Sequence, residues 1–361
     1  MPTISKGYGA KGSFRQKLGP MNIERGEPSE DEVKIKILYC GVCHSDLHQV
    51  KNDWGNTIYP CVPGHEIIGK VEAAGDKVTR FKTGDVVGVG CMIDSCGICP
   101  SCKEGLEQYC EGPKGWTATY NGPQKPDGSN SFGGYSDAVV VKESFVLRIP
   151  PELDIKAAAP ILCAGVTTWS PLKHWKVKEG DKVAIVGLGG LGHMGVKLAV
   201  AMGAEVTVVT TREDKRREAI GLGAEHVILS DNEEELRRNE LKFDFILNTI
   251  PDKYDINAYI CMLKRDGTHV SVGLLGPYKD PLDNGEMAMH RRSLAGSLIG
   301  SIRETQEVLD FCAAHAILPQ VEMIRIQQIN EAFEEMEDEE VRYRFVIDLS
   351  SLGEEEKKSI L

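Results

Sequence analysis

The 361-residue sequence lacks any long apolar segment that is free of charges and glycines. Residues 1–17, MPTISKGYGAKGSFRQK, are polar and contain no apolar core of signal-peptide length. The longest weakly charged stretch, residues 183–209, is interrupted by His193, Lys197 and repeated glycines, so it predicts a strand, turn, helix and strand better than a membrane span. We therefore expect no export and no membrane partner, and cysteines that stay reduced in the cytoplasm.

Positive charge is also scarce. The formal net charge of −12 argues against a protein that binds nucleic acid by neutralising phosphates. With 41% hydrophobic and 27% charged residues, the composition is ordinary for a soluble globular enzyme, and the length predicts two domains. We expect a small-molecule substrate and no nucleic-acid partner.

Cysteine, in contrast, is concentrated in residues 91–110, CMIDSCGICPSCKEGLEQYC. A C-x2-C-x2-C-x7-C spacing there can place four thiolates around one Zn²⁺, and its members are Cys96, Cys99, Cys102 and Cys110. Four sulfur ligands leave no open position, so this site would stabilise a loop rather than catalyse. Disulfides and an iron–sulfur cluster are the alternatives. We interpret Cys91, outside the pattern, as a small buried residue of the preceding strand.

A second group of metal-binding residue types lies upstream, in CGVCHSDLH at 40–48 and GHE at 64–66. Ligands from separate loops converge on one ion when strands deliver them to the same end of a domain. Cys43 and His65 are the best candidates for such ligands. Each residue alone is unremarkable, because a lone Cys or His is more often structural.

Residues 182–192, KVAIVGLGGLG, predict a dinucleotide-binding loop. An apolar strand-like run precedes a G-x-G-x-x-G pattern, and a helix-like segment and a second strand, EVTVVT, follow it. In this βαβ context the helix N-terminus faces a pyrophosphate. The predicted cofactor contacts in the loop are Gly187, Leu188, Gly189, Gly190, Leu191 and Gly192.

The end of the second strand indicates which dinucleotide binds. A site for NAD(H) offers an acid here to the ribose hydroxyls, but this chain has Thr210, Thr211 and Arg212, followed by Lys215. Hydroxyls and cations suit the 2′-phosphate of NADP(H). Glu213 lies only slightly beyond the expected position and keeps NAD(H) open as the alternative.

Strand-like runs continue to alternate with helix-like segments, as a doubly wound parallel sheet requires. We place this nucleotide domain at residues 154–295. The preceding residues 1–153 are rich in short strands and turn signals, which predict a mostly β domain. The predicted fold class is therefore α/β, with a β-rich domain beside a parallel-sheet domain.

Residues 64–78, GHEIIGKVEAAGDKV, fit the pattern G-H-E-x2-G-x5-G-x2-V at every fixed position. Over essentially its whole length the chain resembles the zinc-dependent medium-chain alcohol dehydrogenases. The segments CGVCHSDLHQVKNDWG, ILCAGVTTWSPLK and GSLIGSIRETQEVLDF look closest to the cinnamyl alcohol dehydrogenase branch. The resemblance implies a GroES-like catalytic domain at 1–153 that is completed by 296–361, a Rossmann domain at 154–295, and a homodimer.

The resemblance also implies roles for individual residues. Cys43, His65 and Cys163 would hold a catalytic zinc with Glu66 beside it, so the chain would bind two zinc ions. Asp46 would accept a hydrogen bond from His65. Further implied roles are a proton relay through Ser45 and His48 and a cofactor contact at Thr167. For the relay pair, local bonding to backbone and simple surface exposure are the alternatives.

Together these features predict a zinc-dependent NADP(H) alcohol dehydrogenase or aldehyde reductase that acts on primary, aromatic or allylic substrates. One alternative is a dehydrogenase of the same scaffold for polyols or thiol-adducted formaldehyde. Another is a non-catalytic, zinc-stabilised NADP-binding sensor, which would bind one zinc ion instead of two. His290, Arg291 and Arg292 are expected to be solvated surface residues, and a contact with the cofactor or the other subunit is the alternative.

Overall fold

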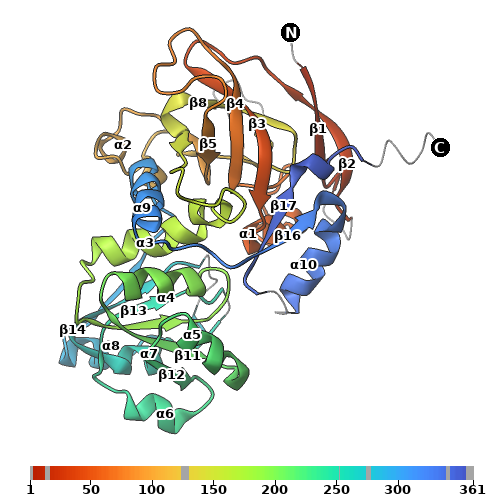
Figure 1. Cartoon of the computed structure of the whole chain (residues 1–361). Helices are drawn as coiled ribbons and strands as arrows, with labels where there is room; N and C mark the ends of the chain where they lie inside the picture. The colour runs from red at the N-terminus through yellow and green to blue at the C-terminus, as the bar shows by residue number, and fades with distance from the viewer. Residues whose placement is uncertain are drawn as a thin grey trace. The chain divides into compact units, whose positions relative to one another are not determined.

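The computed structural model describes residues 3–12, 17–122, 130–251, 253–273, 278–338 and 342–354. The chain divides into two compact units, which Figure 1 shows with their elements labelled. The first unit comprises Met1–Cys163 and Ser301–Leu361, and the second unit comprises Ala164–Gly300. Both ends of the chain therefore contribute to the first unit.

The first unit is built mainly from β-strands. Its largest sheet has the strand order β16-β17-β3-β4-β5-β9, and β8 also pairs with β3. Along β3 the apolar Val33, Ile35 and Ile37 are buried while the lysines between them face outward, as the two-residue period of a strand requires. The strands are β1 (Thr3–Gly9), β2 (Gly19–Arg25), β3 (Glu32–Gly41), β4 (Ile67–Ala74), β5 (Val86–Val89), β6 (Met92–Asp94), β7 (Thr117–Ala118), β8 (Ala138–Lys142), β9 (Leu147–Arg148), β16 (Val321–Arg325) and β17 (Arg344–Asp348).

The C-terminal strand β17 returns to this sheet and pairs antiparallel with β3, where Ile347 lies opposite Cys40. This pairing brings the last described part of the chain to the end of β3, next to the first candidate ligand. The helices of the unit are α1 (His44–Lys51), α2 (Pro100–Lys103), α9 (Ile302–Ala314) and α10 (Ile329–Glu337). Short 3-10 turns are η1 (Glu107–Tyr109), η2 (Glu143–Phe145), η3 (Ala159–Leu162), η5 (Ile326–Gln328) and η6 (Leu349–Ser351).

The second unit is a parallel six-stranded sheet with the order β12-β11-β10-β13-β14-β15. The order reverses between β10 and β13, which is where doubly wound sheets bind ligands. Helices alternate with these strands along the chain (Figure 1). The predicted fold class is thereby confirmed. The elements are α3 (Ala164–His174), β10 (Lys182–Val186), α4 (Gly192–Ala201), β11 (Glu205–Thr210), η4 (Glu213–Lys215), α5 (Arg216–Gly221), β12 (His226–Leu229), α6 (Glu233–Arg238), β13 (Phe243–Asn248), α7 (Ile256–Met262), β14 (Leu263–Ser271), α8 (Asn284–Met289) and β15 (Ser293–Gly296).

Arg292 corrects one expectation, because it is buried rather than solvated. Its guanidinium donates to the carbonyl oxygens of Cys261 at 3.2 Å and Leu263 at 2.9 Å, and to the Glu286 carboxylate at 2.9 Å. The last carbonyl oxygens of a helix have no hydrogen-bond partner within the helix. The Arg292 guanidinium donates hydrogen bonds to such carbonyl oxygens at the C-terminal end of α7. The prediction of a surface residue was wrong because the two carbonyl partners, Leu263 and Cys261, lie 29 and 31 positions away along the chain.

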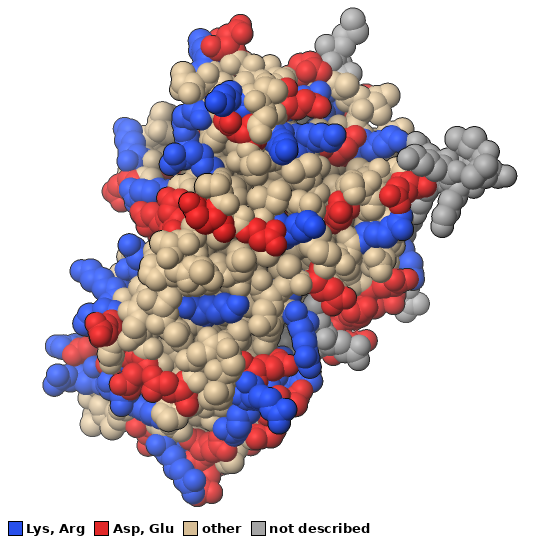
Figure 2. All heavy atoms as spheres, in the orientation of Figure 1, with Lys and Arg blue, Asp and Glu red and all other residues tan. Residues whose placement is uncertain are grey.

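Charges of both signs are interspersed on the face of the molecule drawn in Figure 2. Such mixing is typical of a protein surface that faces water. Among the described residues, no helix is long and apolar enough to cross a membrane.

Candidate active site and metal sites

Four candidate ligands converge in the first unit. Single ligand atoms of Cys43, His65, Glu66 and Cys163 all lie within 4.8 Å of one another, and all four residues are buried. Cys43 follows β3 and is the N-cap of α1, whereas His65 and Glu66 directly precede β4. Because β3 and β4 are antiparallel neighbours, the end of one strand lies beside the start of the next. Cys163 joins them from the end of η3.

The donor atoms of this cluster suit zinc. Two thiols and an imidazole are ligands that Zn²⁺ takes in tetrahedral sites, with bonds of about 2.0–2.3 Å. Nε2 of His65 lies 3.3 Å from Sγ of Cys163. This separation is close to the edge of about 3.5 Å that a tetrahedron with such bonds has. The residues present therefore fit the metal.

Asp46 lies behind the cluster and orients its histidine. The Asp46 carboxylate, which is fully buried, accepts a hydrogen bond from Nδ1 of His65 at 3.0 Å. A carboxylate only accepts, so Nδ1 carries the proton and Nε2 keeps its lone pair for a metal. Burial lowers the pKa of His65, but the charge and hydrogen bond of Asp46 together with the neighbouring Cys91 and Cys43 thiols outweigh it and hold that pKa well above its usual value. The hydrogen bond with Cys163 holds the pKa of Cys43 well below its usual value, and the charge of Arg344 adds to this effect.

Glu66 pairs with Arg344, a residue that the sequence analysis missed. The pair is buried, with Oε1 of Glu66 accepting from Nη2 of Arg344, while Oε2 has no hydrogen-bond partner among the described residues. Gly41 makes room for this carboxylate, because a Cβ there would overlap Oε2. Arg344 begins β17, 278 positions along the chain from Glu66, and no local pattern signals the contact.

The proposed relay residues lie on α1, just after Cys43. Ser45 is partly buried, and His48 one turn later has a side chain that is 34% exposed. Nδ1 of His48 lies 2.8 Å from Oδ2 of Asp53, and its ring centroid is 5.8 Å from that of Trp54. The helix therefore carries a partly buried hydroxyl two residues after Cys43 and a partly exposed imidazole one turn further on.

Cys91 differs from the prediction of a buried strand residue. Strand β5 ends at Val89, and Cys91 is partly exposed. Its thiol donates to the carbonyl oxygen of Leu162 at 3.8 Å, and its interaction with the Cys163 thiol lowers the pKa of Cys91. A fifth sulfur thus lies beside the cluster. Its sequence spacing belongs to no ligand pattern, so the sequence gives no signal for this position.

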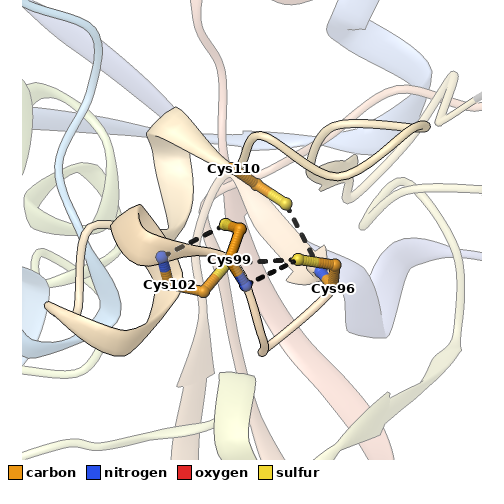
Figure 3. Close-up of side chains that lie close together, drawn as sticks. All are labelled: Cys96, Cys99, Cys102 and Cys110. Atoms are coloured by element: carbon orange, nitrogen blue, oxygen red, sulfur yellow. Dashed lines mark hydrogen bonds between the residues drawn. The ribbon is translucent and has the colours of Figure 1, made fainter.

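The second cysteine group, which we call the clasp, comprises Cys96, Cys99, Cys102 and Cys110, and Figure 3 shows their side chains gathered around one point. Sγ of Cys96 lies 3.9 Å from Sγ of Cys102. This distance is close to the value of about 3.8 Å expected between two thiolates on one tetrahedral zinc.

Backbone amides support the clasp sulfurs. N–H groups of Cys99 and Cys102 donate to Sγ of Cys96 and Cys99 respectively, each at 3.4 Å. The amides of Ile98 and Cys99 lower the pKa of Cys96 to about 6, whereas burial raises the pKa of Cys102 to about 12. Amide donors that stabilise negative sulfur favour the thiolate form that binds metal.

In the second unit the glycine-rich loop connects β10 to the start of α4. Gly187 has a positive φ of 88°, and a Cβ at Gly192 would lie only 2.0 Å from the Gly187 carbonyl oxygen, so both positions require glycine. A Cβ at the exposed Gly189, by contrast, would meet no atom within 4 Å. This open space in front of a helix N-terminus fits a pyrophosphate.

One residue after β11, Lys215, contacts this loop. Nζ of Lys215 donates to the carbonyl oxygen of Leu188 at 3.2 Å. Arg212 pairs with Asp214 at 2.6 Å, and the side chain of Thr211 is exposed. Oγ1 of Thr210 accepts from the amide of Arg212 at 3.3 Å. The cations and hydroxyls predicted to bind a phosphate therefore lie in one short segment beside the glycine loop.

The acid that would favour NAD(H) is already paired. Glu213 accepts from Nε and Nη2 of Arg216 at 2.9 and 3.1 Å, and these bonds lower its pKa.

Elsewhere in the unit, Thr167 is buried in α3 and its hydroxyl has no partner among the described residues. A buried hydroxyl without a partner is costly, which is consistent with a polar ligand there.

Comparison with known proteins identifies the family. The Alcohol dehydrogenase GroES-like domain family matches residues 29–151, and the Zinc-binding dehydrogenase family matches residues 190–314. The aldehyde reductase YahK of Escherichia coli is 53% identical over 342 residues, which cover 94% of this chain and 97% of the relative. The chain belongs to the zinc-type medium-chain alcohol dehydrogenases, as predicted.

Two solved structures resemble the whole chain. The cinnamyl alcohol dehydrogenase of Sorghum bicolor superposes with a TM-score of 0.93 at 39% identity, covering 96% of this chain and 98% of that one. The cinnamyl alcohol dehydrogenase of Helicobacter pylori complexed with NADP(H) superposes with a TM-score of 0.90 at 39% identity, covering 97% and 99%.

Proposed function

We propose that the chain is a zinc-dependent NADP(H) alcohol dehydrogenase that reduces primary, aromatic or allylic aldehydes and oxidises the corresponding alcohols. The observation that carries this proposal is the buried cluster of Cys43, His65 and Cys163 with Asp46 behind the histidine. Three protein ligands leave one of zinc's four positions open, as a catalytic site needs. The named activity of the E. coli relative supports the same reaction.

Each side chain of the first unit then has a task. Bound zinc supplies a Lewis acid that polarises a carbonyl group, and the nicotinamide supplies hydride. Cys43, His65 and Cys163 hold the ion, and Asp46 keeps the imidazole in the required tautomer. Ser45 and His48 carry a proton between the reacting oxygen and solvent, and the contact with Asp53 orients the His48 ring. The free oxygen of Glu66 is a further ligand that can approach the metal.

The second unit favours the phosphorylated cofactor. Gly189 leaves room for the pyrophosphate. Lys215 provides a cation for the 2′-phosphate, and Arg212 provides a second one by exchanging its partner Asp214 for the phosphate. Because Glu213 is held by Arg216, it competes poorly for ribose hydroxyls. The NADP(H) complex of the H. pylori relative supports this choice.

The proposal is tested by following cofactor oxidation at 340 nm with cinnamaldehyde, in parallel with NADPH and NADH. We expect turnover with NADPH and little with NADH, and two zinc ions per chain by elemental analysis. Cys43→Ser should abolish turnover and leave one zinc ion, whereas Cys91→Ser should keep both ions. Turnover only with formaldehyde and a thiol would favour the thiol-adduct alternative, and one zinc ion in the parent protein would favour the sensor.

We also infer a homodimer in a reducing compartment, the cytoplasm. Strand β15 lies at the end of its sheet and pairs with β14 alone within the described part of the chain. An edge strand offers backbone groups to a second copy, and two-fold pairing is the commonest assembly of soluble proteins. Two zinc sites built on cysteines require reduced thiols. Light scattering after size exclusion should give twice the chain mass.

A further inference from the structure

The carboxylate of Asp46 makes more contacts than orientation of one histidine requires. Its two oxygens accept the backbone N–H of Cys43 at 2.9 Å and the backbone N–H of Gly64 at 3.0 Å, besides Nδ1 of His65. The same side chain therefore connects the loops that carry two of the candidate zinc ligands. Any group that holds Asp46 in place holds both loops.

Two buried tyrosines supply such groups. Oη of Tyr135, whose side chain is fully buried, donates to Oδ2 of Asp46 at 3.4 Å. Tyr120 is 7% exposed, and its hydroxyl lies close enough to the Asp46 carboxylate to interact with it. Its ring lies along the imidazole of His65, with centroids 5.7 Å apart and planes inclined by 32°.

The backbone next to Tyr135 is joined to the loop that carries His65. The amides of Gly134 and Tyr135 donate to the carbonyl oxygens of Gly64 at 2.8 Å and Pro63 at 2.9 Å. The Tyr135 ring also packs against Gly64, where a Cβ would lie 2.7 Å from Cδ1 of the ring. The tyrosine is thus fixed to the same loop whose histidine its hydroxyl helps to orient.

We propose that Tyr120 and Tyr135 are positioning residues that control how tightly the catalytic cluster holds its zinc. Their hydroxyls fix the rotamer of Asp46, and the Tyr120 ring restricts rotation of the His65 imidazole. This inference rests on the proposed function, because it assumes that the cluster binds zinc. Outer groups that orient a metal-binding histidine typically change metal affinity by about 10- to 100-fold.

A structural explanation competes with this one. A buried tyrosine hydroxyl needs some partner, and Asp46 could serve only to satisfy it. In that case removal of the hydroxyls would lower the free energy of unfolding, and the rate of zinc release would stay the same as in the parent protein. The two explanations therefore differ in a measurement on the metal, not in the catalytic rate.

The experiment compares the holoenzyme with Tyr120→Phe, Tyr135→Phe and the double variant. Zinc transfer to a chromophoric chelator is followed, and the clasp ion serves as an internal reference. Tyr259→Phe is the matched control, because Tyr259 is buried, its hydroxyl interacts with Ser230, and it lies in the second unit. Urea midpoints of all variants report folding stability.

We expect one of the two zinc ions to leave roughly ten-fold faster in each single variant and faster still in the double variant. Cobalt placed in the cluster should show a shifted visible absorption band in the same variants and not in Tyr259→Phe. Unchanged release of two zinc ions, with only the urea midpoint lowered, would overturn the inference. If the parent protein contained only one zinc ion, the proposed function, on which this inference rests, would be refuted instead.

Discussion

Glu66 and Arg344 form an ion pair that solvent does not reach, with side-chain exposures of 0% and 3%. Removing two charges from water costs free energy, and their mutual attraction offsets this desolvation cost only in part. The pair is therefore weak evidence for a stabilising contact. What it does provide is a cation that neutralises a carboxylate beside the candidate zinc ligands, where an unpaired negative charge would be far more costly.

Loss of Arg344 alone should be more harmful than loss of both partners. Arg344→Met leaves the Glu66 carboxylate buried and unpaired, so we expect the free energy of unfolding to fall by about 3–5 kcal/mol. The double variant Glu66→Gln with Arg344→Met should recover part of this loss because no uncompensated charge remains. Urea unfolding of the three proteins measures both quantities.

The exposed pair Arg325–Glu354 is the matched control, with side chains 59% and 48% exposed. Arg325→Met should lower the free energy of unfolding by less than about 1 kcal/mol. If the double variant were no more stable than Arg344→Met, loss of packing, and not the unpaired Glu66 charge, would account for the lower free energy of unfolding.

At the scale of elements, the sequence predicted what neighbouring residues determine. The β10–loop–α4–β11 unit follows from apolar periodicity and three glycines, and the clasp follows from cysteine spacing. Arg344, Tyr135 and Arg292 could not be found in this way. Each meets its partner only after strands far apart in the chain have paired, as with Tyr135, 89 positions from Asp46. Long-range packing, and not local propensity, decides such contacts.

Strand β14 contains a buried histidine, from which we expect the stability of the fold to be sensitive to acid. His269 is fully buried, and its Nδ1 has no hydrogen-bond partner among the described residues, while Nε2 lies 3.5 Å from the Tyr254 hydroxyl. Burial lowers the pKa of His269 to about 3. The native imidazole is therefore neutral at pH values where the unfolded chain takes up a proton.

The sign of the pH effect follows from this difference. Above the unfolded pKa of about 6.5 neither state binds the proton, so the contribution of neutral His269 is fully present. As the pH falls from about 6.5 towards 3, only the unfolded state becomes protonated. Stability then falls by up to about 1.4 kcal/mol per pH unit from this residue.

We expect His269→Gln to remove this slope between pH 6 and pH 5, as measured by urea unfolding at several pH values. The exposed His226 on β12 provides the control, and His226→Gln should keep the parent slope. An unchanged slope in His269→Gln would mean that the buried ring already acquires its proton in the native state.

At the scale of the whole molecule, metal and cofactor residues are separated between the units. Every candidate zinc ligand belongs to the first unit, and the glycine loop and the predicted phosphate residues belong to the second. The second unit also has its own apolar core, which is formed around β10, β13 and α7. We therefore expect the second unit to fold without a zinc ion.

Cofactor binding and metal binding should consequently be separable. After removal of zinc by a chelator, we expect NADPH affinity to stay within about three-fold of the holoenzyme, since the phosphate contacts remain. Conversely, Arg212→Ala should weaken NADPH binding about ten-fold or more, because loss of a charge-assisted hydrogen bond lowers affinity by at least that factor. The variant should retain both zinc ions. Titration of NADPH fluorescence and elemental analysis measure the two properties. If zinc removal reduced NADPH affinity as strongly as Arg212→Ala does, the second unit would depend on the metal sites of the first, and the division of tasks between the units would be wrong.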